Sequence, residues 1–173
     1  TDKMIQAVGS ADLVLTAGRL YDSLSALTDK VQVMGVMDTV SYINAHGKEP
    51  IIICVAASGD TGFYSIASTI AKNVRPEIEM EFISGIGSLS CFMAKLKLGY
   101  EDIKTVSLHG RNKSIVPYVC YHEKVFALTG GTLKVQDIAK QLRKAGLSNV
   151  TMYIGENLSL EEERILTGNP ADF

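Results

Sequence analysis

Short apolar runs of strand length alternate with segments of helical periodicity along most of this chain. The clearest run is IIICVAA, residues 51–57, which is continuously apolar. Such a run is typical of a central parallel strand that is covered on both faces. Strands that alternate with helices of about a dozen residues indicate βαβ units. The sequence therefore predicts an α/β fold with mainly parallel sheets.

The expected strands and helices follow one another in a regular order. The expected strands are residues 11–16, 31–37, 51–57, 79–83, 105–108, 124–128 and 150–154. The expected helices are residues 3–8, 38–45, 62–73, 89–98 and 133–145. The pattern is interrupted by a polar stretch near Asn112, so we predict two domains, residues 1–111 and 112–173. An α/β sheet normally begins with a strand and this chain begins with a helix, so we expect both domains to be incomplete.

Composition excludes several classes of protein. The 173 residues carry a net charge of −2, whereas proteins that bind nucleic acids usually carry a basic surplus. The apolar runs fall well short of the roughly 20 residues that span a bilayer, so we expect no membrane segment. The three cysteines lie far apart and match neither a disulfide framework nor a metal-binding spacing. We predict a cytoplasmic protein without a metal site.

The turn ASGDTGFY follows the most apolar strand and has the composition of a ligand-binding loop. Ligands of open α/β sheets collect at the carboxyl ends of the strands. Gly59 and Gly62 let a ligand approach the backbone closely, and Asp60 can accept hydrogen bonds from a ribose or an amine. The alternative is that Asp60 only caps the helix that follows.

A second turn, SGIGS at residues 84–88, also exposes bare backbone. It resembles half of a dinucleotide fingerprint, but the third glycine is missing. The carboxylate that this motif needs about 20 residues further on is missing as well. The turn therefore either contacts a ligand through its backbone or is purely structural.

The third turn, SLHGR, places His109 and Arg111 at the end of an expected strand. The imidazole can exchange a proton near neutral pH, and the guanidinium is permanently cationic. A lone histidine is nevertheless more often structural than catalytic. Phosphate-binding P-loop and nucleophile-elbow motifs are absent from the sequence. We interpret the glutamate run at residues 161–163 as a solvated helix face.

Six segments taken in order resemble the tetrapyrrole methylases, which transfer a methyl group from S-adenosylmethionine. They are ADLVLTAGRL, VAASGDTGFYSIA, ISGIGSLSCFMAKL, VSLHGR, FALTGGTLKVQDIAKQL and YIGENLSLEEERILTG. The SLHGR and GENLS…EERI elements are typical of the branch that methylates carbon 5 of cobalt-precorrin-7 or precorrin-6Y in cobalamin biosynthesis. The resemblance implies two α/β domains with a ligand cleft between them. It also implies that the family's N-terminal Gly-rich loop is missing here.

The resemblance assigns a set of backbone turns to S-adenosylmethionine and its product S-adenosylhomocysteine. These cofactor-binding residues are Gly59, Asp60, Phe63, Gly87, Ser88, Leu128, Thr129, Gly155 and Glu156. It places His109 and Arg111 on the substrate side as the candidate catalytic residues. Arg19 and Lys113 are further candidates to bind substrate carboxylates. The family's pattern is altered at Thr61, at Ser84-Gly85 and at Gly130, where the family has the Asp of a DG pair.

The function implied is methylation of a ring carbon of a tetrapyrrole by a homodimeric enzyme. The decarboxylating methylase that is fused to some relatives would here be a separate partner protein. Two alternatives stay open from the residues themselves. The chain could instead be an α/β enzyme with a nucleotide cofactor, or a non-catalytic relative that binds a tetrapyrrole or S-adenosylmethionine.

Overall fold

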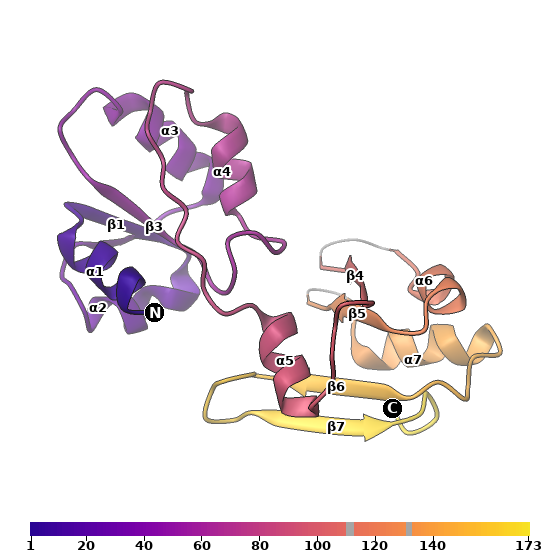
Figure 1. Cartoon of the computed structure of the whole chain (residues 1–173). Coiled ribbons are helices and arrows are strands. Elements are labelled where there is room, and N and C mark those ends of the chain that lie inside the picture. Colours follow the sequence, from indigo (N-terminus) through magenta and orange to yellow (C-terminus); the bar gives the residue numbers. More distant parts are fainter. Residues whose placement is uncertain (110–112, 131–132) are drawn as a thin grey trace. The chain divides into compact units, whose positions relative to one another are not determined.

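The computed structural model describes residues 1–109, 113–130 and 133–173. The chain forms two compact units, Thr1–Gly87 and Ser88–Phe173, each with its own sheet and core (Figure 1). Both units mix helices with parallel strands, which confirms the predicted α/β class. Within the described residues, no helix is both long and apolar enough to cross a membrane.

The first unit is built on a three-stranded parallel sheet in the order β2-β1-β3. Its strands are β1 (Leu13–Thr16), β2 (Val31–Val33) and β3 (Ile53–Ala56). Val14 pairs with Val31 on one side and with Cys54 on the other, so β1 lies in the middle. All four residues of β1 are buried. The central strand is therefore β1, and the prediction that residues 51–57 form the central strand is wrong.

Helices cover both faces of this sheet (Figure 1). On one face lie α1 (Asp2–Ser10) and α2 (Tyr21–Ser25), and on the other α3 (Val36–His46) and α4 (Ala67–Asn73). A short 3-10 helix, η1 (Gly18–Leu20), follows β1.

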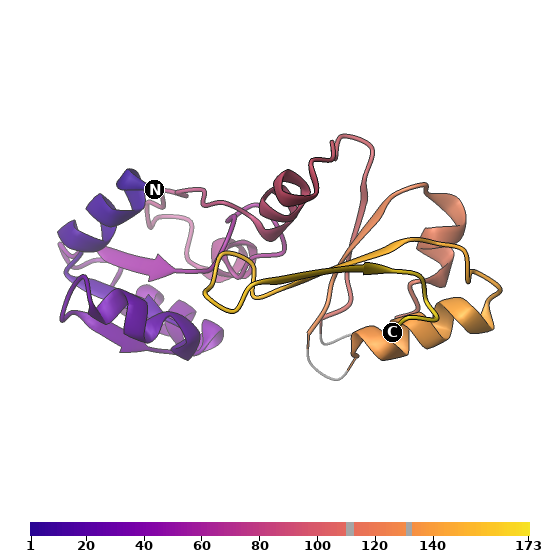
Figure 2. The ribbon, with the colours of Figure 1, turned by 90° about the horizontal axis from the view of Figure 1, so that it is seen from below.

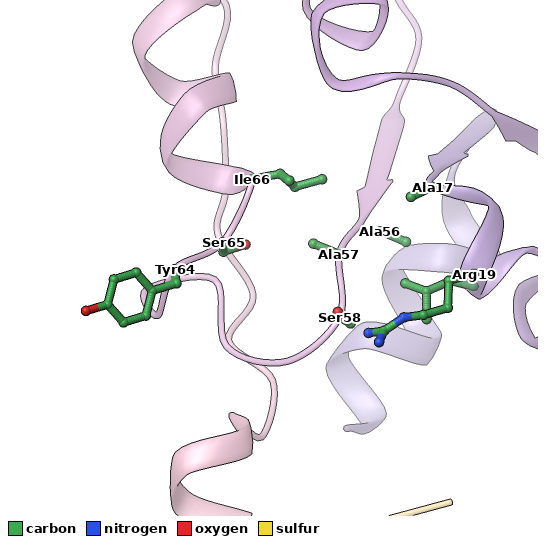
Figure 3. Close-up of a pocket in the computed structure, with 9 residues that line it drawn as sticks. Ala17, Arg19, Ala56, Ala57, Ser58, Tyr64, Ser65 and Ile66 are labelled. Carbon is green, nitrogen blue, oxygen red and sulfur yellow. The ribbon is translucent and has the colours of Figure 1, made fainter. Parts of the chain in front are cut away.

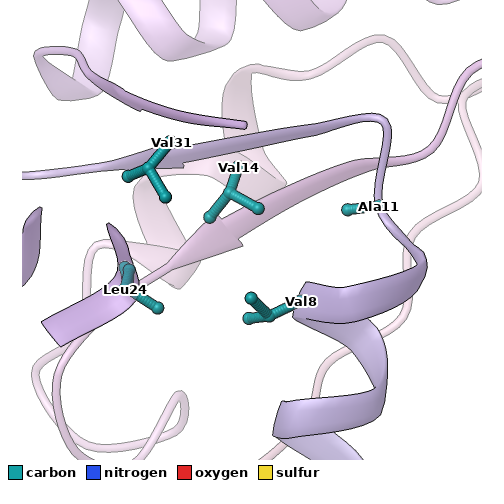
Figure 4. Close-up of a cluster of buried hydrophobic side chains, with 5 residues drawn as sticks. All are labelled: Val8, Ala11, Val14, Leu24 and Val31. Carbon is teal, nitrogen blue, oxygen red and sulfur yellow. The ribbon is translucent and has the colours of Figure 1, made fainter. Parts of the chain in front are cut away.

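The core of the first unit is divided between the two faces of the sheet. Figure 4 shows one cluster, Val8, Ala11, Val14, Leu24 and Val31. Cys54 and Ala56 of β3 pack against this cluster, whereas Ile53 and Val55 pack against the cluster of α3 and α4. Residues of β3 thus alternate between the two faces. The continuous apolar run reflects cover on both faces, although among the described residues β3 pairs only with β1.

Residues 79–83 form no strand, contrary to the prediction. Met80 and Phe82 are exposed, so the segment buries too little apolar surface to hold it in the sheet. It continues instead as an irregular connection to α5 (Ser88–Leu96).

The second unit contains the parallel pair β4 (Lys104–Ser107) and β5 (Val125–Leu128). Helices α6 (Val116–Tyr121) and α7 (Val135–Lys144) accompany this pair. Their shared core is Val106, Leu108, Ile115, Ile138 and Leu142. Because β4 pairs with β5, both strands belong to one unit. The two compact units divide after Gly87, whereas the sequence analysis expects a domain boundary at residue 111.

Helix α7 ends as the sequence predicts. Gly146 has φ +77°, its N–H bonds to the Arg143 carbonyl, and the Leu147 N–H bonds to the Leu142 carbonyl. These bonds form the Schellman arrangement that glycine favours after a helix.

An antiparallel hairpin completes the second unit. Its strands are β6 (Met152–Glu156) and β7 (Arg164–Gly168), side by side in Figures 1 and 2. The pattern did not predict β7. The glutamate run at residues 161–163 lies in the loop of this hairpin, so its interpretation as a helix face is wrong.

The burial of β1 yields a stability prediction. Leu15 is fully buried, and Leu15→Ala should lower the free energy of unfolding by about 2–5 kcal/mol, because it leaves a cavity in the core. The matched control Leu27→Ala removes the same atoms from a side chain that is 51% exposed. It should change the free energy of unfolding by less than about 1 kcal/mol. Urea unfolding of both variants measures the difference; equal losses would contradict the central position of β1.

Candidate functional site

The carboxyl ends of β1 and β3 enclose a small pocket of about 150 Å³. It is lined by Ala17, Arg19, Leu20, Ala56, Ala57, Ser58, Tyr64, Ser65 and Ile66 (Figure 3). The Thr16 hydroxyl lies at the end of β1 and donates to the Ala56 carbonyl at 3.2 Å, which holds the two strand ends together. The pocket thus occupies the edge of the sheet at which open α/β folds bind ligands.

Arg19 is the cation of this pocket. Figure 3 shows its guanidinium group turned toward Ser58, while the Tyr64 ring points away from the pocket. Over the described parts of the chain, Arg19 forms no ion pair, so its charge is available to an anionic ligand. Serine hydroxyls at Ser58 and Ser65 add hydrogen-bonding groups. A carboxylate suits this combination of groups.

Asp60 connects the first two glycine turns. Its Oδ1 accepts hydrogen bonds from the Gly62 N–H at 2.8 Å and from the Ser84 hydroxyl at 3.1 Å. Helix α4 begins only at Ala67 and has Ile66 as its N-cap, so Asp60 does not cap it. The alternative that Asp60 is a helix cap is therefore wrong, and Asp60 instead fixes the loop.

Bare backbone from the two turns meets at Gly59 and Gly85. A Cβ atom at position 85 would collide with the Gly59 carbonyl oxygen, and one at position 59 would lie 3.9 Å from the Gly87 Cα. Gly59 also has φ +82°, which favours glycine. The backbones of the two turns are therefore in direct contact. Phe63 follows in the first turn, and its ring meets the Tyr64 ring edge to face at 4.9 Å.

In the second unit, the carboxyl ends of β4 and β5 bring several predicted site residues together. The Leu108 N–H bonds to the Leu128 carbonyl at 2.9 Å, so His109 and Thr129 follow adjacent strand ends. The His109 ring lies against Gly130, where any Cβ atom would collide with Nδ1 of that ring. Arg111 lies outside the described residues.

Gly155 and Glu156 close strand β6, and each has a defined neighbour. A Cβ atom at position 155 would lie 2.8 Å from the Phe92 ring of α5, so the helix sits directly over this backbone. Ser88, another predicted cofactor contact, is the first residue of the same helix. Glu156 forms an ion pair with Arg164 across the hairpin at 2.6 Å.

The hairpin loop contains a polar connection to α5 that the sequence interpretation missed. Lys95 Nζ lies 2.7 Å from Oε1 of Glu163, and Oε2 of Glu163 accepts the Ser159 N–H at 2.6 Å. The hydrogen bond from Lys95 and then that from Ser159 lower the pKa of Glu163, and Glu163 raises the pKa of Lys95. A run of three glutamates gives no sign that one of them is bonded.

The comparisons with known proteins agree with this architecture. The sequence model of the family described as Tetrapyrrole (Corrin/Porphyrin) Methylases matches residues 1–173. The chain belongs to this family. The predicted resemblance and the predicted fold class are confirmed, whereas the roles of individual site residues stay predictions.

Two curated tetrapyrrole methylases are similar over most of the chain. A probable cobalt-precorrin-7 C(5)-methyltransferase from Methanocaldococcus jannaschii is 30% identical over 95% of this chain and 80% of that protein. The cobalt-precorrin-7 C(5)-methyltransferase of Salmonella typhimurium is 29% identical over 95% of this chain and 81% of that protein.

Solved structures share the fold at low sequence identity. The precorrin-6Y methylase of Archaeoglobus fulgidus matches with a TM-score of 0.74 and 17% identity, over 100% of this chain and 84% of that one. A uroporphyrin-III C-methyltransferase from Thermus thermophilus, solved with S-adenosylhomocysteine, matches with a TM-score of 0.77 and 18% identity. The match covers 99% of this chain and 82% of that one.

The contact between the glycine turns yields a prediction about stability. Gly85→Ala should lower the unfolding temperature by several degrees, because the added methyl group collides with backbone that cannot move aside cheaply. Gly62→Ala is the matched control, since its methyl group would lie 3.4 Å from Asp60 Oδ1, at the edge of ordinary contact. Thermal unfolding followed by circular dichroism compares them; a Gly85→Ala variant as stable as Gly62→Ala would refute the close approach.

The lowered pKa of Glu163 yields a prediction about pH. The folded-state pKa lies below the ordinary value of 4.5, so Glu163 stabilises the fold above that value and loses this effect as the pH falls through the folded-state pKa. When the pH is lowered from about 6 to about 3.5, the unfolding temperature should therefore fall less for Glu163→Gln than for the unchanged protein. For the control Glu162→Gln, the unfolding temperature should fall as much as for the unchanged protein. Identical pH profiles for the two variants would contradict the prediction.

Proposed function

We propose that this chain is an S-adenosylmethionine-dependent methyltransferase that acts on a ring carbon of a corrin precursor in cobalamin biosynthesis. The observation that carries the proposal is the family match over residues 1–173 together with 30% identity to the Methanocaldococcus relative. The names of both curated relatives favour carbon 5 of cobalt-precorrin-7 as the acceptor.

Bare backbone in the first unit supports the assignment of its two glycine turns to the adenosyl group. Gly59, Gly85 and Gly87 leave backbone without side chains where the two turns meet, and Asp60 holds that geometry through Gly62 and Ser84. We assign Gly59, Asp60, Phe63 and Gly87 of this unit to the cofactor. From the second unit we assign Ser88, Leu128, Thr129, Gly155 and Glu156.

The cofactor supplies an activated sulfonium methyl group, so the protein needs no covalent intermediate. The task of these turns is to hold donor and acceptor in line and to exclude water. Positioning of this kind can lower a barrier by about 7–11 kcal/mol. Rigid turns fixed by hydrogen bonds, as at Asp60, are suited to this task.

Substrate binding falls to cations and to His109. Corrin precursors carry several carboxylates, and the Arg19 pocket offers a guanidinium with two hydroxyls. At about 150 Å³ it suits one carboxylate arm rather than a whole macrocycle, because pockets for drug-sized ligands begin at about 300 Å³. We assign His109 and Arg111 to the reacting face of the substrate, and Lys113 to a further carboxylate.

The assembly of the enzyme is a separate part of the proposal. The family resemblance supports a homodimer in the cytoplasm and a separate protein that supplies the decarboxylating methylation. Dimers with two-fold symmetry are the commonest oligomers. Sedimentation of the purified chain tests whether it forms a homodimer.

Titration calorimetry tests the cofactor. S-adenosylhomocysteine should bind at micromolar concentrations and NAD should not, because the SGIGS turn lacks the third glycine and the carboxylate of a dinucleotide site. Binding of NAD alone would replace the proposal with a nucleotide-dependent enzyme. Binding of S-adenosylhomocysteine without methyl transfer to cobalt-precorrin-7 would indicate a non-catalytic relative.

Kinetics of Arg19 variants test the substrate. Arg19→Ala should raise the KM for the tetrapyrrole about tenfold through loss of a charge-assisted hydrogen bond, with unchanged affinity for S-adenosylhomocysteine. Lys48→Ala removes an exposed cation from outside the pocket and should leave both values unchanged. An unchanged KM in Arg19→Ala would remove the pocket from the substrate site.

A further inference from the structure

Helix α5 and the β6–β7 loop are tied together by a chain of polar contacts within the second unit. Lys95 on the helix pairs with one carboxylate oxygen of Glu163, and the other oxygen accepts the Ser159 N–H. The Ser159 hydroxyl in turn lies 3.2 Å from Sγ of Cys91, one helical turn before Lys95. Glu163 is thus the branch point that joins the helix to the loop backbone.

The contacts hold both charges in place. The side chains of Lys95 and Glu163 are 34% and 24% exposed, so the pair is shielded more than an ordinary surface ion pair. The pKa of Lys95 is raised and that of Glu163 lowered, each first by their mutual hydrogen bond. Both groups therefore favour the charged form that the contact needs.

The loop adopts a backbone conformation that needs such support. Asn157 has φ +51° and Ser159 has φ +67°, in the left-handed region that side chains other than glycine disfavour. Such residues persist where the surroundings determine their conformation. For Ser159 the surroundings are Glu163 at its N–H and Cys91 at its hydroxyl.

The same helix also touches the backbone that precedes the loop. The Phe92 ring lies where a Cβ atom of Gly155 would be, and Leu158 closes the same space from the loop, 3.1 Å from that position. An apolar contact at Phe92 and an ion pair at Lys95 therefore fix α5 relative to the end of β6 at two points. Ser88 at the start of α5 is held relative to Gly155 by this arrangement.

We propose that Lys95 and Glu163 are positioning residues, whose ion pair anchors the C-terminal end of α5 to the β6–β7 loop and, through the helix, sets the position of Ser88 for the cofactor. The inference rests on the proposed function, in which Ser88 and Gly155 contact S-adenosylmethionine. Neither Lys95 nor Glu163 needs to touch the cofactor, because both act through the helix and the loop.

Four variants test the inference by calorimetry with S-adenosylhomocysteine and by thermal unfolding. Lys95→Met and Glu163→Gln should weaken binding about tenfold while the unfolding temperature at neutral pH falls by only a few degrees. Lys95→Arg keeps the ion pair and should bind as the unchanged protein does. Glu162→Gln is the matched control in the same loop and should bind normally.

Steady-state kinetics separates positioning from general damage. Lys95→Met should raise the KM for S-adenosylmethionine and leave the KM for the tetrapyrrole unchanged. Lys95→Arg should have the same KM for S-adenosylmethionine as the unchanged protein. If Lys95→Met does not fold, Glu163→Asp decides, because it keeps the charge but shortens the reach to Lys95 and should also weaken binding. Absence of binding by the unchanged protein would refute the proposed function. Binding by the unchanged protein, with equal affinity in Lys95→Met or Glu163→Asp, would overturn only this inference.

Discussion

The burial of β1 between two parallel neighbours is the constraint on which the first unit depends. Pairing of Val14 with both Val31 and Cys54 brings the carboxyl ends of three strands to one edge. The Thr16 hydroxyl then binds the Ala56 carbonyl, so the ASGD turn leaves the sheet at a fixed point. The Arg19 pocket and the start of the first glycine turn both follow from this arrangement. Each of these features lies at the edge because the strands run parallel.

Hydrophobic periodicity was sufficient to locate most of the sheet but not to order it. The runs at residues 11–16, 51–57 and 124–128 became β1, β3 and β5 because apolar runs of that length are buried wherever they pair. Their neighbours depend on the whole fold, so the sequence pointed to β3 as central although β1 is. Residues 79–83 have strand-like composition, yet two exposed apolar side chains cannot hold them in a ladder. The hairpin strand β7 was missed because the preceding glutamates suggested a helix.

For the candidate site, the sequence indicated the turns and missed the contacts between them. Gly59 and Gly85 could be selected from composition, since glycine marks places where backbone approaches backbone. The Asp60–Ser84 bond joins residues of two different turns, and no local pattern reports such a bond. The sequence identifies Arg19 as a candidate cation for substrate carboxylates. Its place in a pocket depends on the short helix η1 that follows β1. Glu163 differs from its two neighbours through its contacts with Lys95 and with the Ser159 N–H.

The contact between His109 and Gly130 has a consequence for what position 130 can accommodate. The imidazole occupies the space that a side chain at position 130 would need, so a substitution at Gly130 would require the exposed His109 side chain to move. The backbone adds a second constraint, because Gly130 has φ +153°, a conformation that side chains rarely adopt. Glycine at position 130 thus leaves the ring of His109 free to lie across the end of β5.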